Sequence, residues 1–142
     1  MTGLPDADPL PPVIAHLTGH PAVTAALGGP GRVGDGNDPP YPRLRVTDPP
    51  GGRENLRTRV VGQRIQIEAL GTLDGPALGK KALRDILYTA LQALLELPEA
   101  PAGTGQTVIT EVESAAGGGY VPLADGRPRY VAVVTVTAHP GQ

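Results

Sequence analysis

The C-terminal segment at residues 127–139 (RPRYVAVVTVTAH) constrains the fold more than any other part of the sequence, because β-branched and small apolar residues follow one another almost without a break after its first residues. Side chains alternate between the two faces of a strand, so Ala132 and Val134 lie on one face while Val131 and Val133 lie on the other. Neither face suits water. A chain of 142 residues with one convincing helix needs a second layer of its own, or another copy of itself, to cover the second face. Assembly into an oligomer is therefore the first hypothesis.

The composition supports one modest hydrophobic core. Hydrophobic residues make up 39% of the chain, Phe and Trp are absent, and many of the 20 glycines and 17 prolines lie between the expected helices and strands. We therefore expect one domain over residues 1–142. Within it, residues 1–8 are expected to form a flexible tail, and residues 47–59 and 115–128 to form mobile loops.

Apolar residues recur with helical and strand periods along the chain. Two short helices are expected between Asp8 and Leu27, separated by Gly19, and a long amphipathic helix is expected over residues 76–97. Alternating side chains predict strands at residues 43–46, 61–69, 107–113 and 129–139. The prediction is an α+β fold, in which a mainly antiparallel sheet of about four strands is packed by one long helix and two short N-terminal helices. The long helix covers one face of the last strand, and we expect the N-terminal helices or a neighbouring subunit to cover the other.

The composition also excludes several classes of function. Cysteine is absent, which excludes disulfides, thiolate metal sites and thiol catalysis. No secretory signal or membrane-spanning segment is recognisable, so we expect synthesis in the cytoplasm and no membrane partner. A formal net charge of -2 argues against general nucleic-acid binding, and the lack of aromatic residues among the basic ones argues against sequence-specific recognition.

Two motifs that suggest a catalytic or nucleotide site lack the required context. Residues 29–34 match GxGxxG, but Pro30 removes a backbone amide that a phosphate would need, and prolines follow where a helix should begin. The single serine, Ser114, has no GxSxG around it. We therefore expect no catalytic residue, no cofactor and no enzymatic activity.

Two histidines have a spacing that zinc sites use. His16 and His20 are four residues apart, as are the ligands on a zinc-binding helix. Zinc enzymes usually carry a glutamate beside the first histidine, where this sequence has Leu17, and Gly19 interrupts the helix. A capping or surface role is favoured, and no metal is expected.

Charges are unevenly distributed along the chain. Residues 43–64 are rich in arginine, whereas residues 65–125 are predominantly acidic. Glu111 and Glu113 share one face of a predicted strand, where Glu68 can join them, and we interpret this face as solvated or turned toward another subunit. A chain with two oppositely charged parts can stack head to tail on itself.

Five segments in a fixed order carry a family resemblance. They are the short helices ending in HPAVTAALGG, the PYPRLRV segment, the QRIQIEAL strand, the helix GPALGKKALRDILYTALQALLEL and the closing RPRYVAVVTVTAHP. Together they resemble the tail-terminator (tail-completion) proteins of long-tailed bacteriophages. The resemblance covers residues 10–139 and depends on the order of the elements, the chain length and the local amino-acid composition.

This resemblance implies a structural virion protein. Such proteins form a hexameric ring on the head-proximal end of the tail tube, where they stop polymerisation of the tube protein and offer a docking face to the neck of the head. The implied partners are copies of the same chain, the major tail tube protein and a neck or connector protein. The loops at residues 47–59 and 115–128 are candidates for contacts with the tube or neck.

A ring needs one patch of each subunit to meet a different patch of the next. We hypothesise that arginines of one subunit face glutamates of its neighbour. The candidate arginines are Arg43, Arg45, Arg57, Arg59 and Arg64, and the candidate glutamates are Glu68, Glu111 and Glu113.

Two alternatives stay open. One is a neck or head-tail connector protein of the same virion. The other belongs to a different class, a cellular ferredoxin-like binding module or small enzyme.

Overall fold

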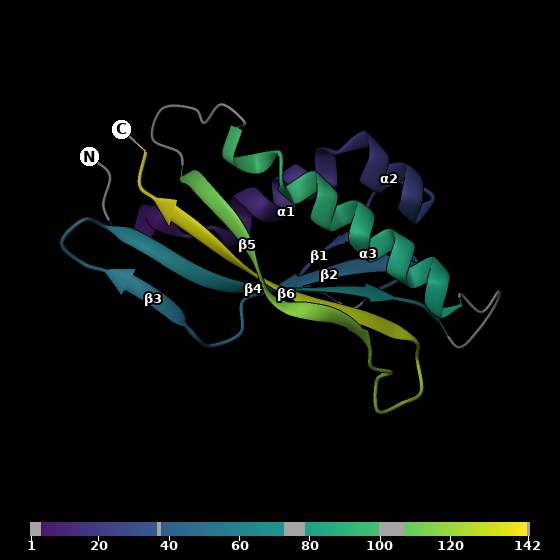
Figure 1. Cartoon of the computed structure of the whole chain (residues 1–142). Helices are drawn as coiled ribbons and strands as arrows, with labels where there is room; N and C mark the ends of the chain where they lie inside the picture. Colours follow the sequence, from purple (N-terminus) through teal and green to yellow (C-terminus); the bar gives the residue numbers. More distant parts are fainter. Residues whose placement is uncertain (1–3, 37, 73–78, 100–106, 142) are drawn as a thin grey trace.

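The computed structural model describes residues 4–36, 38–72, 79–99 and 107–141, and it shows a β-sheet with α-helices packed on one of its faces (Figure 1). The strands are β1 (Val33–Gly34), β2 (Arg43–Thr47), β3 (Gly52–Asn55), β4 (Val60–Leu70), β5 (Val108–Tyr120) and β6 (Arg129–His139). The α-helices are α1 (Leu10–Gly19), α2 (Pro21–Leu27) and α3 (Lys80–Leu94), and the 3₁₀ helices are η1 (Leu4–Ala7) and η2 (Leu97–Glu99).

Within the described ranges the sheet is mixed and has six strands. Its order is β1-β2-β4-β6-β5, and β3 pairs with the part of β4 that β2 leaves free. β1 and β2 are parallel, whereas the other pairs are antiparallel. The predicted sheet of about four mainly antiparallel strands is therefore wrong. β1 has only two residues and β3 (GREN) has no apolar residue, so neither carries the alternation that reveals a strand.

Proline lies at the start of α1 and α2, and glycine lies at the end of α2. Pro11 lies in the first turn of α1 and Pro21 opens α2, positions at which the missing amide costs no helical hydrogen bond. Gly28 ends α2 with a φ of 86°, a conformation that glycine adopts without strain. The predicted start of the long helix, at residue 76, lies outside the described residues, and α3 ends at Leu94.

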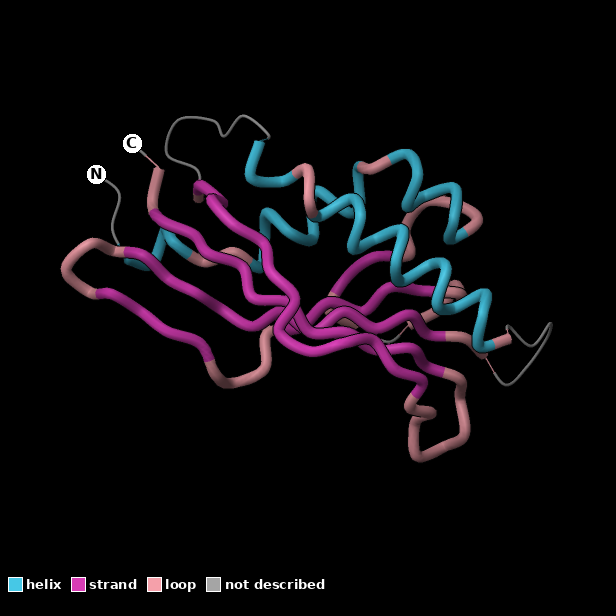
Figure 2. The backbone as a smooth tube through the Cα atoms, viewed as in Figure 1, coloured by secondary structure: helices cyan, strands magenta, loops and turns pink. Residues whose placement is uncertain are grey.

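The segment from residue 47 to residue 59, predicted to be a mobile loop, contains β3. Strands β2 and β3 run as one interrupted strand along β4, with residues 48–51 opposite only Arg64 and Ile65. Pro49 and Pro50 explain the interruption, because proline has no amide to donate to the sheet. The hairpin then turns through residues 56–59 and extends away from the helices (Figure 2).

Two further expectations about mobile segments need correction. β5 continues to Tyr120, so the connection to β6 comprises residues 121–128 and not 115–128. Residues 4–7 form η1, and Ala7 is buried, so a flexible tail does not extend to residue 8. Glycine and proline in residues 1–8 and 115–128 suggested loops. A 3₁₀ turn and the continuation of β5 form there through backbone hydrogen bonds, which do not need an alternating pattern of side chains.

The core lies between the helices and one face of the sheet. The side chains that β6 directs toward the helices are buried, and so are the facing side chains of α3. In β6 these are Tyr130, Ala132, Val134, Val136 and Ala138, and in α3 they are Leu83, Ile86, Leu87, Ala90, Ala93 and Leu94.

The opposite face of the sheet, here called the open face, has no helix over it in the described part of the chain (Figure 1). The N-terminal helices lie on the same side as α3, so the expectation that they cover the second face is wrong. On β6 this face carries the half-buried residues Val131, Val133, Thr135 and Thr137. Strand register places Arg45, Arg53, Arg64, Gln66, Glu68, Glu111 and Glu113 on it as well.

Replacing Leu87 with alanine tests the packing of α3 on the sheet. Leu87 is 0% exposed, so Leu87→Ala should lower the free energy of unfolding by about 3 kcal/mol, through lost burial and the cavity left behind. Leu95→Ala is the matched control, because Leu95 is 58% exposed. Urea unfolding followed by circular dichroism measures both, and equal effects would contradict this placement of α3.

Candidate functional site

The open face has opposite charges at its two lateral edges. Thr135 of β6 lies opposite Arg64 of β4 on one side and opposite Glu113 of β5 on the other. Since neighbouring strands are about 4.8 Å apart, the backbones of Arg64 and Glu113 are separated by about 10 Å. A second row runs from Arg53 through Gly62 and Thr137 to Glu111. The β3 and β4 side of the open face is therefore basic, and the β5 side is acidic.

The basic side surrounds a hollow of about 710 Å³. Arg53 and Arg64 line it together with Thr135 and Thr137, and both arginines are exposed. No ion pair joins either arginine to another residue in the described ranges. These guanidinium groups are available to a partner.

The acidic side consists of two carboxylates that interact with each other. A hydrogen bond between Glu111 and Glu113, followed by repulsion between their charges, raises the pKa of Glu111 above its ordinary value. Both side chains are exposed on the outermost strand, β5. A cationic group from outside the chain would relieve the repulsion.

The predicted interface residues fall into two groups. Arg57, Arg59, Arg64, Glu111 and Glu113 are exposed and turned outward. Arg57 and Arg59 lie in the turn that closes the β3–β4 hairpin, where the Asn55 side chain accepts a hydrogen bond from the Arg57 amide at 3.2 Å.

The second group is engaged within the chain. Arg43 is buried, and its Nε donates to the backbone oxygen of Gly36 at 2.9 Å. Glu68 is 2% exposed and lies between Arg45 and Arg129, with nitrogen–oxygen distances of 3.7 and 3.2 Å. These residues stabilise the open face from within, so they are poorly placed to contact a neighbouring subunit.

Sequence reasoning missed Arg129 as a partner of Glu68. The two residues are 61 positions apart, and only the register of β4 with β6 brings them together. The Gln66 side chain also donates to Glu68. Both hydrogen bonds, from Gln66 of β4 and Arg129 of β6, reach Oε1 of Glu68, whereas Oε2 faces Arg45 at 3.7 Å and accepts no hydrogen bond in the described ranges. The two arginines offset the charge of this buried carboxylate.

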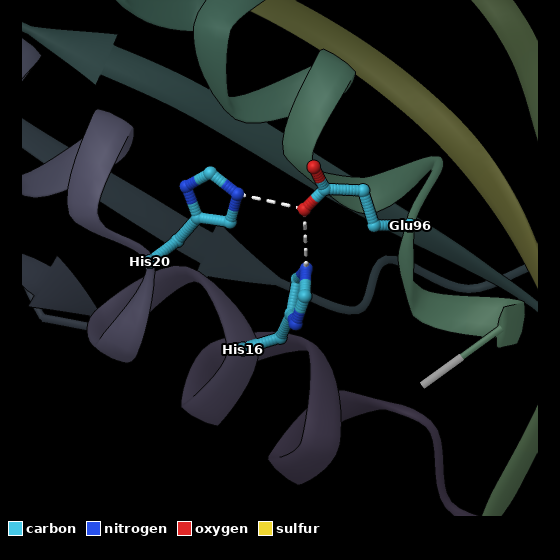
Figure 3. A group of neighbouring side chains, drawn as sticks. All are labelled: His16, His20 and Glu96. Atoms are coloured by element: carbon cyan, nitrogen blue, oxygen red, sulfur yellow. Dashed lines mark hydrogen bonds and ion pairs between the residues drawn. The ribbon is translucent and has the colours of Figure 1, made fainter. Parts of the chain in front are cut away.

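The two histidines of the N-terminal helices come together with a distant glutamate. His20 does cap α1, but through its backbone amide, which donates to Leu17, and its side chain makes no capping bond. Instead, its Nε2 lies 2.7 Å from Oε2 of Glu96, and Nε2 of His16 lies 3.9 Å from the same oxygen (Figure 3). The predicted capping role is therefore wrong for the His20 side chain. Sequence periodicity did not indicate that Glu96 lies beside it.

Comparison with known proteins identifies no family for this chain. No protein-family model matches the chain, and no curated protein sequence matches it significantly. Among the helices in the described ranges, none combines the length and apolar character needed to cross a membrane.

Replacing Glu68 with glutamine tests the buried charge cluster. Glu68→Gln should lower the free energy of unfolding by about 2 kcal/mol, because it leaves Arg45 and Arg129 without their carboxylate partner, while partial exposure of both arginines limits the loss. Glu113→Gln, at an exposed position of the same face, should change it by less than about 0.5 kcal/mol. Urea unfolding at neutral pH compares the two, and equal values would overturn the assignment of Glu68 as a structural residue.

Proposed function

We propose that the protein is a structural protein of a long-tailed bacteriophage, a tail terminator that forms a homo-oligomeric ring at the head-proximal end of the tail. The observation that carries this proposal is the charge separation on the open face, basic along β3 and β4 and acidic along β5. Opposite charges at opposite edges favour contacts in which one edge of a subunit meets the other edge of the next, which is the contact type that closes into rings.

Strand direction supports the same contact. Strands β3, β4, β6 and β5 follow one another with alternating direction across the sheet. A neighbouring copy placed beside β5 in the same orientation would present its β3 antiparallel to β5. Backbone pairing and charge pairing then favour one arrangement, with Arg53 and Arg64 of one copy near Glu111 and Glu113 of the next.

The long hairpin of β3 and β4 supports a contact with a further partner. Its turn is exposed, and Leu56 within it is 71% exposed. An apolar side chain at the end of a protruding hairpin, flanked by Arg57 and Arg59, suits docking onto another protein surface. In a ring on the tail tube, this hairpin would contact the tube protein or the neck.

Charge reversal tests ring formation. We expect the wild-type protein to form a ring, a hexamer by the resemblance to tail terminators, and Arg64→Glu to shift it to monomer because like charges then face each other. Combining Arg64→Glu with Glu113→Arg should restore assembly. Light scattering coupled to gel filtration measures the mass at several salt concentrations, and salt should weaken the wild-type assembly.

Lys80→Glu is the matched control, because Lys80 is exposed at the start of α3, on the other side of the sheet. It should leave the mass unchanged. A wild-type chain that stays monomeric at all concentrations, or an Arg64→Glu variant that assembles normally, would contradict the proposed contact.

Addition to polymerising tail tube protein tests the function itself. We expect the ring to bind one end of the tube and stop its growth, which electron microscopy of tube lengths would measure. Rings that leave tube growth unchanged but bind the head's neck complex would favour a connector protein instead.

A further inference from the structure

We propose that His16, His20 and Glu96 bind a Zn²⁺ ion. One ligand atom from each of the three residues lies within 4.8 Å of the others (Figure 3). Two imidazoles and a carboxylate form a ligand set that zinc uses with water as the fourth ligand. The site joins the α1–α2 connection to the turn after α3, on the helical side of the sheet.

The fold brings the three side chains together for independent reasons. Four residues separate His16, near the end of α1, from His20, between α1 and α2. Their rings are 5.6 Å apart between centroids. α3 packs against both helices, and Glu96 follows its last turn. The carboxylate therefore reaches the histidines from an element that is remote in sequence.

The distances are close to those that zinc requires. Zinc–nitrogen and zinc–oxygen bonds of about 2.1 Å in a tetrahedron place ligand atoms about 3.4 Å apart. The distance from His20 Nε2 to Glu96 Oε2 is 2.7 Å, and the distance from His16 Nε2 to the same oxygen is 3.9 Å. The three ligand atoms lie within 4.8 Å of one another, so side-chain shifts of about 1.4 Å or less would bring them to the required separation.

A backbone carbonyl competes with zinc for the Nε2 atom of His16. The Nε2–H group of His16 donates a hydrogen bond of 2.8 Å to the backbone oxygen of Ala93. That oxygen also accepts the backbone amide of Glu96 at 3.1 Å. His16 binds zinc through Nε2 after the ring proton moves from Nε2 to Nδ1. The Ala93 oxygen then keeps the Glu96 amide as its hydrogen-bonding partner, so the exchange leaves no carbonyl unpaired.

A fourth ligand position can be reached from solvent. Both histidine side chains are 18% exposed, whereas the Glu96 side chain is 59% exposed. His20 and Glu96 line a hollow of about 540 Å³, together with polar residues that include Asp85 and Gln92. Water can enter this hollow and complete the tetrahedron. Two imidazole ligands favour zinc over Mg²⁺ and Ca²⁺, which prefer oxygen ligands throughout.

Titration of the tag-free protein with Zn²⁺ tests the proposal. We expect one Zn²⁺ per chain by calorimetry, and Co²⁺ at the same site should give the visible absorption band of tetrahedral cobalt. His20→Ala and Glu96→Gln should each weaken Zn²⁺ binding at least about tenfold. His139→Ala is the matched control, because His139 lies at the end of β6 and should leave the affinity unchanged.

Two outcomes would overturn the site. One is equal loss of binding in His139→Ala and His20→Ala, and the other is no binding by a folded wild-type protein. Circular dichroism of each variant confirms folding, and Glu96→Gln, at an exposed position, keeps the test valid if His20→Ala fails to fold. Zn²⁺ binding is measured on the chain itself, so it is independent of whether the protein forms a ring.

Discussion

The antiparallel pairing of β4 with β6 is the interaction on which the rest of the structure depends. The two strands stay in register from Val61 opposite Ala138 to Leu70 opposite Arg129. This register directs one set of side chains into the core under α3 and the other set onto the open face. A slip of one residue would reverse both sets, so burial of the apolar set also fixes which charged residues point outward. The row from Arg64 to Glu113 is therefore a consequence of core packing.

Sequence patterns predicted the elements that have an apolar face and missed those that do not. The two short helices, the long helix and the strands around β2, β4, β5 and β6 are confirmed, because each alternates or repeats its apolar residues. β3 is polar throughout, and β1 is too short for any period to appear. Glu68 pairs with Arg129, and Glu96 lies beside His20, although the residues of each pair are remote in sequence. The periodicity of a single sequence does not indicate which remote residues come into contact.

The two candidate sites lie on different sides of the sheet and draw on different parts of the fold. The charged rows belong to the strands, and the histidine cluster belongs to the helices that cover the other face (Figure 1). A metal at His16, His20 and Glu96 would fasten α1 and α2 to the end of α3 without touching the open face. Stabilisation of the helical layer and contacts along the strand edges can therefore change independently.

The charges on the outer strands also limit which assemblies the edges allow. An exposed strand edge can pair with any other chain, and proteins commonly restrict this with charged side chains. If two copies met through β5 alone, Glu111 and Glu113 of one would face the same acidic residues of the other. A contact through β3 alone would bring Arg53 and Arg64 of one copy toward the same arginines of the other. Of these three contacts, the pairing of β5 with the β3 side of a neighbour joins unlike charges. Since it leaves a free edge at each end, such a contact would repeat from copy to copy, and the rotation between copies would decide between a closed ring and an open filament.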